Sequence, residues 1–343
     1  MNNSSKVKLV VLELGPDYYT QIRDRLIAKG IECELVKLDS FCLLYAHTRN
    51  EVSRLREILR KEDDEVVVFL PFTTELFLEE PDLTIMFSGY KSGYNPERVK
   101  IIPYVWQPPQ PSMPELQELK WTKKPDLSVG FLGRSHDNRK IVKLAGYLPD
   151  YFKQQILKGR HLKYLYKSRY KKISNLLAWM PCLARMEAVR KLETTSLKTD
   201  IVKHTYTASA EEHKNYQNHM LRNSYILCPR GYENFSFRFY ETLAYGRVPV
   251  LIDTDTVLPP NVNWDELCVR VPYEKMNDLE NIIRNDYETK TEREFLERQE
   301  KAIKVMKELK QMSWLEDIVE EIAKAANYKS NSDLLKVLSS PHR

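Results

Sequence analysis

The residues best suited to chemistry gather in one segment, residues 225–253, where Arg230, Arg238 and Glu241 accompany a helical pattern. Arg230 and Gly231 follow a short apolar run that Pro229 ends. The arginine side chain offers a planar fork of N–H donors that suits phosphate or carboxylate. The start of a helix adds backbone N–H groups that have no partner within the helix. Together these features predict an anion-binding site.

The elements that position this site form a strand–helix–strand unit. Residues 225–228 and 248–252 each predict a short buried strand. Between them, Asn234 is a suitable N-cap for a helix that runs to residue 245, and Gly246 is suited to end that helix. Because crossovers of this kind are right-handed, the two strands are expected to be parallel. Ligands are then expected at the carboxyl edge of their sheet.

Glu241 is placed to bind the ribose of a nucleotide. It lies seven residues after Asn234 and three after Arg238, so the three side chains can share one helical face. At about 1.5 Å per residue, Glu241 lies roughly 10 Å along the axis from Asn234. That is the offset between a diphosphate and the far side of a ribose, where a carboxylate could accept from both hydroxyls. The alternative is a surface pair of Arg238 with Glu241, which contributes little to stability.

The same segment resembles the exostosin family of glycosyltransferases. The family signature is a strand ending in Cys-Pro-Arg-Gly, a Ser-x-Arg-x-x-Glu-x-Leu helix and a Gly-x-x-Pro-Val strand. The matching residues are Cys228-Pro229-Arg230-Gly231, Ser236, Arg238, Glu241, Leu243, Gly246, Pro249 and Val250. The resemblance is strong over about residues 200–272, weaker over 126–140, and negligible in the N-terminal half.

This resemblance implies an α/β protein with the GT-B fold: two facing Rossmann-like domains and a C-terminal helix that crosses back. It implies an inverting, metal-independent glycosyltransferase without a cofactor. The expected reaction moves a sugar from a nucleoside diphosphate, with UDP as the favoured nucleotide, to an acceptor glycan or a lipid-linked glycan. Polysaccharide biosynthesis is the corresponding role. The donor-binding residues it implies are Gly133, Arg139, Arg230, Gly231, Ser236, Arg238 and Glu241, with Gly231 and Ser236 acting through their backbone N–H groups.

Two catalytic roles follow from the implied reaction. Negative charge grows on the leaving diphosphate, and without a divalent ion fixed cations must stabilise it. Arg230 is the expected cation. An inverting transfer also needs a base for the acceptor hydroxyl. Asp17, directly after the first predicted strand, is the expected base, with Glu13 and Glu75 as alternatives.

A second pattern competes with the metal-independent interpretation. Asp253-Thr254-Asp255 follows a predicted strand and has the form of an Asp-x-Asp metal site. Two carboxylates at a strand end could hold Mn²⁺ or Mg²⁺ against a diphosphate. A three-residue pattern is weak, however, and metal binding is the less favoured interpretation.

The rest of the chain divides into two predicted domains. Apolar runs of strand length alternate with helical patterns over residues 1–106, as in a parallel sheet covered on both faces. Residues 107–114 contain four prolines, which is typical of a linker. We therefore expect one domain at 1–118 and another at 119–312. The apolar stripe of a helix at 313–330 needs a partner surface, expected on the first domain.

A basic stretch at residues 151–186 contains no Asp or Glu. Its cations, interleaved with aromatic and aliphatic side chains, include Lys163, Lys167, Arg169, Lys171 and Lys172. A solvated helical face is the ordinary explanation. The favoured functional interpretation is an acceptor surface or an anionic membrane surface near a lipid-linked acceptor, where each cation contributes about 1 kcal/mol. An acidic polysaccharide is an alternative, and nucleic acid is the least favoured.

Composition narrows the class of protein further. The 343 residues are 42% hydrophobic and 29% charged, as in a globular protein. A net charge of +5 does not argue for nucleic acid, and the five cysteines lack the spacing of a zinc site or disulfide framework. No apolar run approaches the ~18 residues of a membrane span, and no signal-peptide pattern opens the sequence. The expected location is the cytoplasm, with peripheral membrane contact.

Two other classes of function stay open at the level of the sequence. One is a non-catalytic exostosin-like partner subunit, which would hydrolyse no donor. The other is a protein that binds an anionic polymer or nucleic acid through residues 151–186, which would show a steep salt dependence. Neither the donor sugar nor the oligomeric state is predicted.

Overall fold

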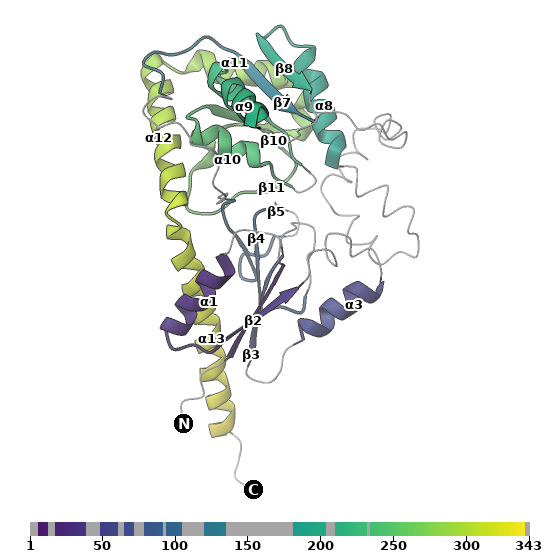
Figure 1. Ribbon diagram of the computed structural model, residues 1–343, viewed down its shortest axis with the longest axis vertical. Helices are drawn as coiled ribbons and strands as arrows, with labels where there is room; N and C mark the ends of the chain where they lie inside the picture. Colours follow the sequence, from purple (N-terminus) through teal and green to yellow (C-terminus); the bar gives the residue numbers. More distant parts are fainter. Residues whose placement is uncertain are drawn as a thin grey trace. The chain divides into compact units, whose positions relative to one another are not determined.

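The computed structural model divides the chain into two compact units (Figure 1). The first comprises Met1–Gly89, Gly93–Trp106 and Met312–Arg343, and the second comprises Tyr90–Ser92 and Gln107–Gln311. The predicted boundary at 118/119 lies outside the described residues and stays a prediction. The residues that the structure describes are 6–12, 18–38, 49–60, 65–71, 79–91, 94–104, 120–134, 181–203, 210–231 and 234–339.

The first unit contains a five-stranded sheet in the order β2-β1-β3-β4-β6, in which all neighbouring strands are parallel. The strands are β1 (Lys6–Leu12), β2 (Cys33–Leu38), β3 (Glu65–Leu70), β4 (Leu83–Met86) and β6 (Val99–Ile101). Near-continuous apolar stretches form them because both faces of the central strands are covered: Leu9, Val67 and Phe69 are fully buried. The predicted parallel α/β architecture of this half is confirmed.

Among the described residues, the helices of the first unit are α1 (Tyr18–Ala28), α3 (Arg49–Ile58) and α13 (Ser313–Ser339). The apolar stripe of α13 packs against α1 and β3. The Trp314 ring lies edge-on to Tyr18 at 5.2 Å, and Glu316 forms ion pairs with Arg25 at 2.8 Å and Lys29 at 2.9 Å. The stripe that needed a partner surface in the sequence finds it on α1 and β3.

The second unit contains another five-stranded parallel sheet, in the order β12-β10-β9-β7-β8. Its strands are β7 (Val129–Gly133), β8 (Thr199–Lys203), β9 (Tyr225–Cys228), β10 (Val248–Asp253) and β12 (Val269–Pro272). A separate two-stranded sheet joins β5 (Gly89–Tyr90) to β11 (Thr256–Val257). The predicted parallel pairing of β9 with β10 is confirmed.

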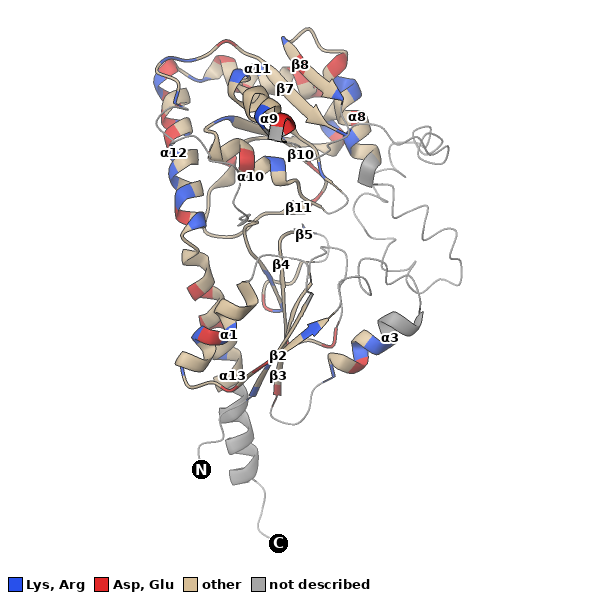
Figure 2. Cartoon of the chain, in the orientation of Figure 1, with Lys and Arg blue, Asp and Glu red and all other residues tan. Residues whose placement is uncertain are grey.

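In the described part of this unit, the α-helices that accompany the sheet are α8 (Pro181–Glu193), α9 (Ala210–Arg222), α10 (Phe237–Ala244), α11 (Leu279–Thr289) and α12 (Glu292–Lys310). The start of α12 is fixed by a capping box, in which Thr291 and Glu294 satisfy each other's backbone N–H groups. Figure 2 shows Lys, Arg, Asp and Glu residues along α12. The apolar face of this helix packs on α10, which anchors the helix of the predicted site.

A buried ion pair links α11 and α12 to the strand that leads into the site. Arg298, 6% exposed, donates two hydrogen bonds of 2.7 Å to the carboxylate of Asp286. The hydroxyl of Tyr225, the first residue of β9, donates to the same carboxylate at 2.8 Å. Burial, and then the negative charge of Asp286, raises the pKa of Tyr225, so its hydroxyl stays protonated and keeps donating.

Candidate active site

The β9–α10–β10 unit forms as predicted, except at the start of its helix. Ser236, not Asn234, is the N-cap of α10, with φ −135° and ψ 129°, and its side chain makes no capping hydrogen bond. Asn234 is fully buried and accepts hydrogen bonds from the hydroxyls of Thr254 at 2.6 Å and Thr256 at 3.3 Å. The side chain of Asn234 therefore joins two loops instead of beginning a helix.

The end of the helix agrees with the sequence. Gly246 has φ +64°, a left-handed conformation that glycine adopts without a steric penalty. The Gly246 N–H donates to the carbonyl of Leu243 at 2.9 Å, and the Arg247 N–H donates to that of Thr242 at 2.9 Å. This geometry satisfies the last carbonyls of α10 and turns the chain directly into β10.

Arg230 lies just beyond the carboxyl end of β9 and is only 2% exposed. Its Nη2 donates to the hydroxyl of Tyr90 at 2.8 Å, and its guanidinium carbon lies 5.5 Å from the centroid of the same ring. Its carbonyl accepts a hydrogen bond of 3.0 Å from Nε of Arg185. The expected catalytic cation is therefore orientated by Tyr90, a contact that the sequence did not predict.

The N–H group of Gly231 serves the turn before the helix. It donates to the carbonyl of Phe235 at 2.9 Å and so closes the turn between β9 and α10. A contact of this N–H with a diphosphate stays a prediction. Ser236 stays at the start of the helix, where its carbonyl accepts from Phe239 at 3.0 Å.

Arg238 and Gly133, more than a hundred residues apart, meet in the structure. Arg238 donates through Nη2 to the carbonyl of Leu132, and its guanidinium lies 4.9 Å from the centroid of the Phe131 ring. Gly133 has φ +152°, and a Cβ atom there would lie 2.6 Å from Nη2 of Arg238. The positive φ is strained for any other residue, and a side chain here would also have to displace the end of the Arg238 side chain.

Glu241 accepts a hydrogen bond through Oε2 from the hydroxyl of Tyr216 on α9. Burial, followed by the negative charge of Glu241, raises the pKa of Tyr216 well above its ordinary value. Tyr216 therefore remains a donor and fixes the carboxylate in place. The sequence did not predict this contact. It joins two residues that are 25 positions apart and lie on different helices.

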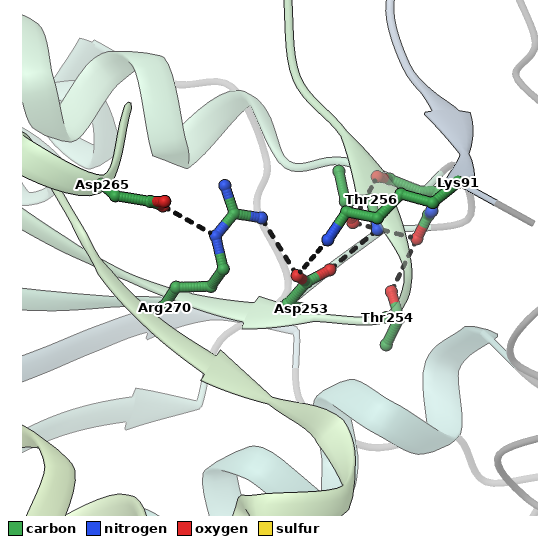
Figure 3. Close-up of polar contacts among 7 residues, drawn as sticks. Lys91, Asp253, Thr254, Thr256, Asp265 and Arg270 are labelled. Carbon is green, nitrogen blue, oxygen red and sulfur yellow. Dashed lines mark hydrogen bonds and ion pairs between the residues drawn. The ribbon is translucent and has the colours of Figure 1, made fainter. Parts of the chain in front are cut away.

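The Asp-x-Asp pattern is part of an ion-pair cluster (Figure 3). Asp253 is 8% exposed and accepts from Lys91 at 2.9 Å and from Arg270 at 3.0 Å. Asp255 has φ +70° and accepts the backbone N–H of Lys91 at 2.9 Å. Among the described residues, no group of three or more His, Cys, Asp or Glu is arranged to hold a metal ion.

Cys228, two residues before Arg230, is a core residue. It is fully buried, and burial raises the pKa of its thiol to about 12. Because the thiolate is the nucleophilic form of cysteine, this residue has no nucleophile to offer at neutral pH.

Several predicted residues lie outside the residues that the structure describes: Asp17, Glu13, Glu75, Arg139, Lys163, Lys167, Arg169, Lys171 and Lys172. Their roles as base, donor contact and acceptor or membrane surface stay predictions. None of the described helices is long and apolar enough to cross a membrane.

Residues 184–285 match the model of the Exostosin GT47 domain. The resemblance to the exostosin family is confirmed. Over 80 residues the chain is 35% identical to a probable glucuronosyltransferase of Oryza sativa subsp. japonica and 31% identical to a probable beta-1,4-xylosyltransferase of Arabidopsis thaliana. The aligned residues are 23% of this chain but only 18% and 19% of those two relatives.

A buried histidine on α9 predicts a pH-dependent stability. His219 is 1% exposed, and its Nε2 lies 2.9 Å from the carbonyl oxygen of Asp200. Its Nδ1 is buried without a hydrogen-bond partner among the described residues. Burial holds the pKa of His219 below its ordinary value, although Asp200 acts in the opposite direction. Protonation would leave a charged N–H buried and unpaired, which is costly.

Acidification from about pH 7.5 to about pH 5.5 is therefore expected to lower the Tm, and His219→Gln should reduce this loss. Below about pH 6.5 the unfolded chain binds a proton at this histidine that the folded chain does not. The stability from His219 is thus present above that pH and falls until the pH passes the lower folded pKa. Thermal melts at both pH values measure it, and identical pH slopes for the two proteins would contradict it.

Proposed function

We propose that this chain is a glycosyltransferase that transfers a sugar from a nucleoside diphosphate to an acceptor glycan or a lipid-linked glycan. The transfer would invert the anomeric carbon and need no metal ion, with a UDP-sugar as the favoured donor. The support is the exostosin match over residues 184–285, together with the chemistry of the side chains on the β9–α10–β10 unit. The names of the relatives, glucuronosyltransferase and xylosyltransferase, agree with a sugar nucleotide as donor.

The observation that carries this proposal is the arrangement along α10. Arg230 precedes the helix, Arg238 lies in its first turn, and Glu241 follows one turn later, held by Tyr216. Cations near the start of a helix suit a diphosphate. A carboxylate further along the same helix suits the hydroxyls of a ribose. The diphosphate and the ribose of a nucleoside diphosphate thus each have a partner of the right chemistry.

The chemical step follows from this arrangement. As the bond between the sugar and the diphosphate breaks, negative charge develops on the leaving oxygen. Arg230 would stabilise that charge most in the transition state, which is the interaction that accelerates a reaction. Its hydrogen bond to Tyr90 keeps the guanidinium orientated before the donor arrives. Preorganisation of this kind avoids reorganisation during the reaction.

The remaining parts of the proposal concern fold, metal and base. Two units that each contain a five-stranded parallel sheet support a GT-B assignment.

Metal independence is supported by the ion pairs of Asp253 with Lys91 and Arg270, which already neutralise this carboxylate. We assign the base to Asp17, with Glu13 and Glu75 as the alternatives. If the transfer needs no metal ion, donor turnover should persist in excess EDTA.

Glu241→Gln is expected to abolish discrimination between a ribonucleotide and its 2′-deoxy analogue. Hydrogen bonds to a charged group contribute about 1.5–3 kcal/mol, so the wild-type protein should bind UDP about ten- to a hundred-fold more tightly than 2′-deoxy-UDP. Glutamine can still accept from Tyr216, which preserves the local fold. Calorimetric titration measures both affinities.

The matched control for this test is Glu297→Gln, an exposed glutamate on α12 that pairs with Arg293. It should leave the preference for the ribonucleotide unchanged. Equal binding of the two nucleotides by the wild-type protein would remove Glu241 from the ribose-binding role. Absence of nucleotide binding altogether would favour the non-catalytic partner subunit.

A further inference from the structure

The carboxylate of Asp253 joins three separate parts of the second unit. It lies at the carboxyl end of β10 and accepts from Nζ of Lys91 and from Nη1 of Arg270 (Figure 3). It also accepts the backbone N–H of Thr256 at 2.8 Å, which closes the turn after β10. A carboxylate with this set of donors is fixed in direction as well as in charge.

Lys91 is held at both its backbone and its side chain. Its N–H donates to the carbonyl of Asp255 at 2.9 Å, while its Nζ donates to Asp253 at 2.9 Å. The turn that receives these bonds is itself held, because Thr254 and Thr256 donate to the buried side chain of Asn234. Lys91 therefore docks on a turn that is rigidly connected to the loop before α10.

The residue before Lys91 contacts the candidate catalytic cation. Tyr90 is 4% exposed, and its hydroxyl accepts the 2.8 Å hydrogen bond from Nη2 of Arg230. Consecutive residues are only about 3.8 Å apart along the chain, so the docking of Lys91 limits where the Tyr90 ring can lie. The contacts form a continuous path from Asp253 through Lys91 and Tyr90 to Arg230.

We propose that Asp253 is a positioning residue that holds Lys91, fixes the adjacent Tyr90 on the guanidinium of Arg230, and so sets the direction in which Arg230 faces the leaving diphosphate. The inference rests on the proposed function for its catalytic consequence. Its structural part, the clamp formed by Tyr90, Lys91 and Asp253, stands independently of that function.

The charges of this clamp are suited to a permanent role. Burial alone would raise the pKa of Asp253, but the N–H of Thr256, Lys91 and Arg270 outweigh it and hold that pKa below its ordinary value. Asp253 thus remains ionised throughout the neutral range. Lys91 is 52% exposed, so its ion pair contributes little to global stability. The ion pair of Lys91 with Asp253 instead fixes the position of residues 90–91.

The first test is hydrogen exchange of the backbone around residue 91 in Asp253→Asn. Asparagine can still accept from Thr256 but loses the charge that holds Lys91, so exchange at the Lys91 N–H should become faster. Asp265→Asn is the matched control: the side chain of Asp265 is 73% exposed, and among the described residues it pairs with Arg270, at 2.9 Å, and not with Lys91. Exchange at residue 91 that is equal in Asp253→Asn and wild type would overturn the clamp.

The second test is the kinetics of donor turnover. Asp253→Asn and Lys91→Met should each lower kcat about ten-fold or more with little change in KM, since small misplacements of a catalytic group are costly. The double variant should lose no more than either single one, and Asp265→Asn should keep the wild-type kcat. If Asp253→Asn does not fold, the Lys91→Met variant alone decides the outcome, because the side chain of Lys91 is half-exposed. Faster exchange with unchanged kcat would overturn the positioning role.

These outcomes separate the inference from the proposed function. A wild-type protein that turns over no nucleotide-sugar refutes the proposed function, and with it the catalytic consequence of the clamp. The hydrogen-exchange result still confirms or refutes the clamp itself in that case. Wild-type turnover with normal exchange at residue 91 in Asp253→Asn refutes the clamp while the proposed function stands.

Discussion

Replacement of Arg230 by alanine is expected to lower donor turnover by about 10²–10³-fold, as for the loss of one donor to a developing oxyanion. The effect should fall on kcat more than on KM, because the charge on the leaving diphosphate is greatest in the transition state. Steady-state kinetics with the preferred nucleotide-sugar measure this split. Turnover within a few-fold of wild type would remove Arg230 from the catalytic role.

Two further variants make this experiment interpretable. Arg230 is 2% exposed, so thermal melting must first establish that Arg230→Ala folds. Arg230→Lys keeps the charge but loses the planar fork of donors, and an intermediate turnover is expected from it. Arg284→Ala is the matched control: this arginine on α11 pairs with Glu280 at 2.8 Å and should be dispensable for turnover.

The second large effect is expected on stability. Asp286→Ala should destabilise the second unit by about 3–5 kcal/mol, because it leaves the buried guanidinium of Arg298 without its carboxylate. The same substitution removes the acceptor of the Tyr225 hydroxyl. Since a two-unit chain need not unfold in one step, hydrogen exchange of peptides from β9 in increasing denaturant is the appropriate measurement.

The control for Asp286→Ala lies on the same pair of helices. Arg293 forms an ion pair with Glu297 on α12, and its side chain is 86% exposed. Arg293→Ala should therefore leave the stability of the second unit almost unchanged. A loss below about 1 kcal/mol for Asp286→Ala would mean that the buried pair is not a principal support of β9.

Local sequence patterns were sufficient to predict the helices and strands of the β9–α10–β10 unit, but not the N-cap of its helix. The buried strands and the glycine that ends α10 follow from hydrophobic runs and from the conformational freedom of glycine. Asn234 was a reasonable N-cap by residue type, yet Ser236 begins the helix. The reason lies in residues distant in the sequence. The hydroxyls of Thr254 and Thr256 donate to the side-chain oxygen of Asn234, which therefore does not cap the helix.

The sequence by itself determined two α/β units with parallel strands, the order of Arg230, Arg238 and Glu241 before and along α10, and the likeness to exostosins. These depend on periodicity and spacing within short segments. Only the tertiary structure decided which partners orientate the key side chains: Tyr90 on Arg230, Tyr216 on Glu241, and Phe131 beneath Arg238. Each of these contacts joins residues distant in the chain. Their geometry depends on how separate elements pack, and no local pattern of residues encodes that packing.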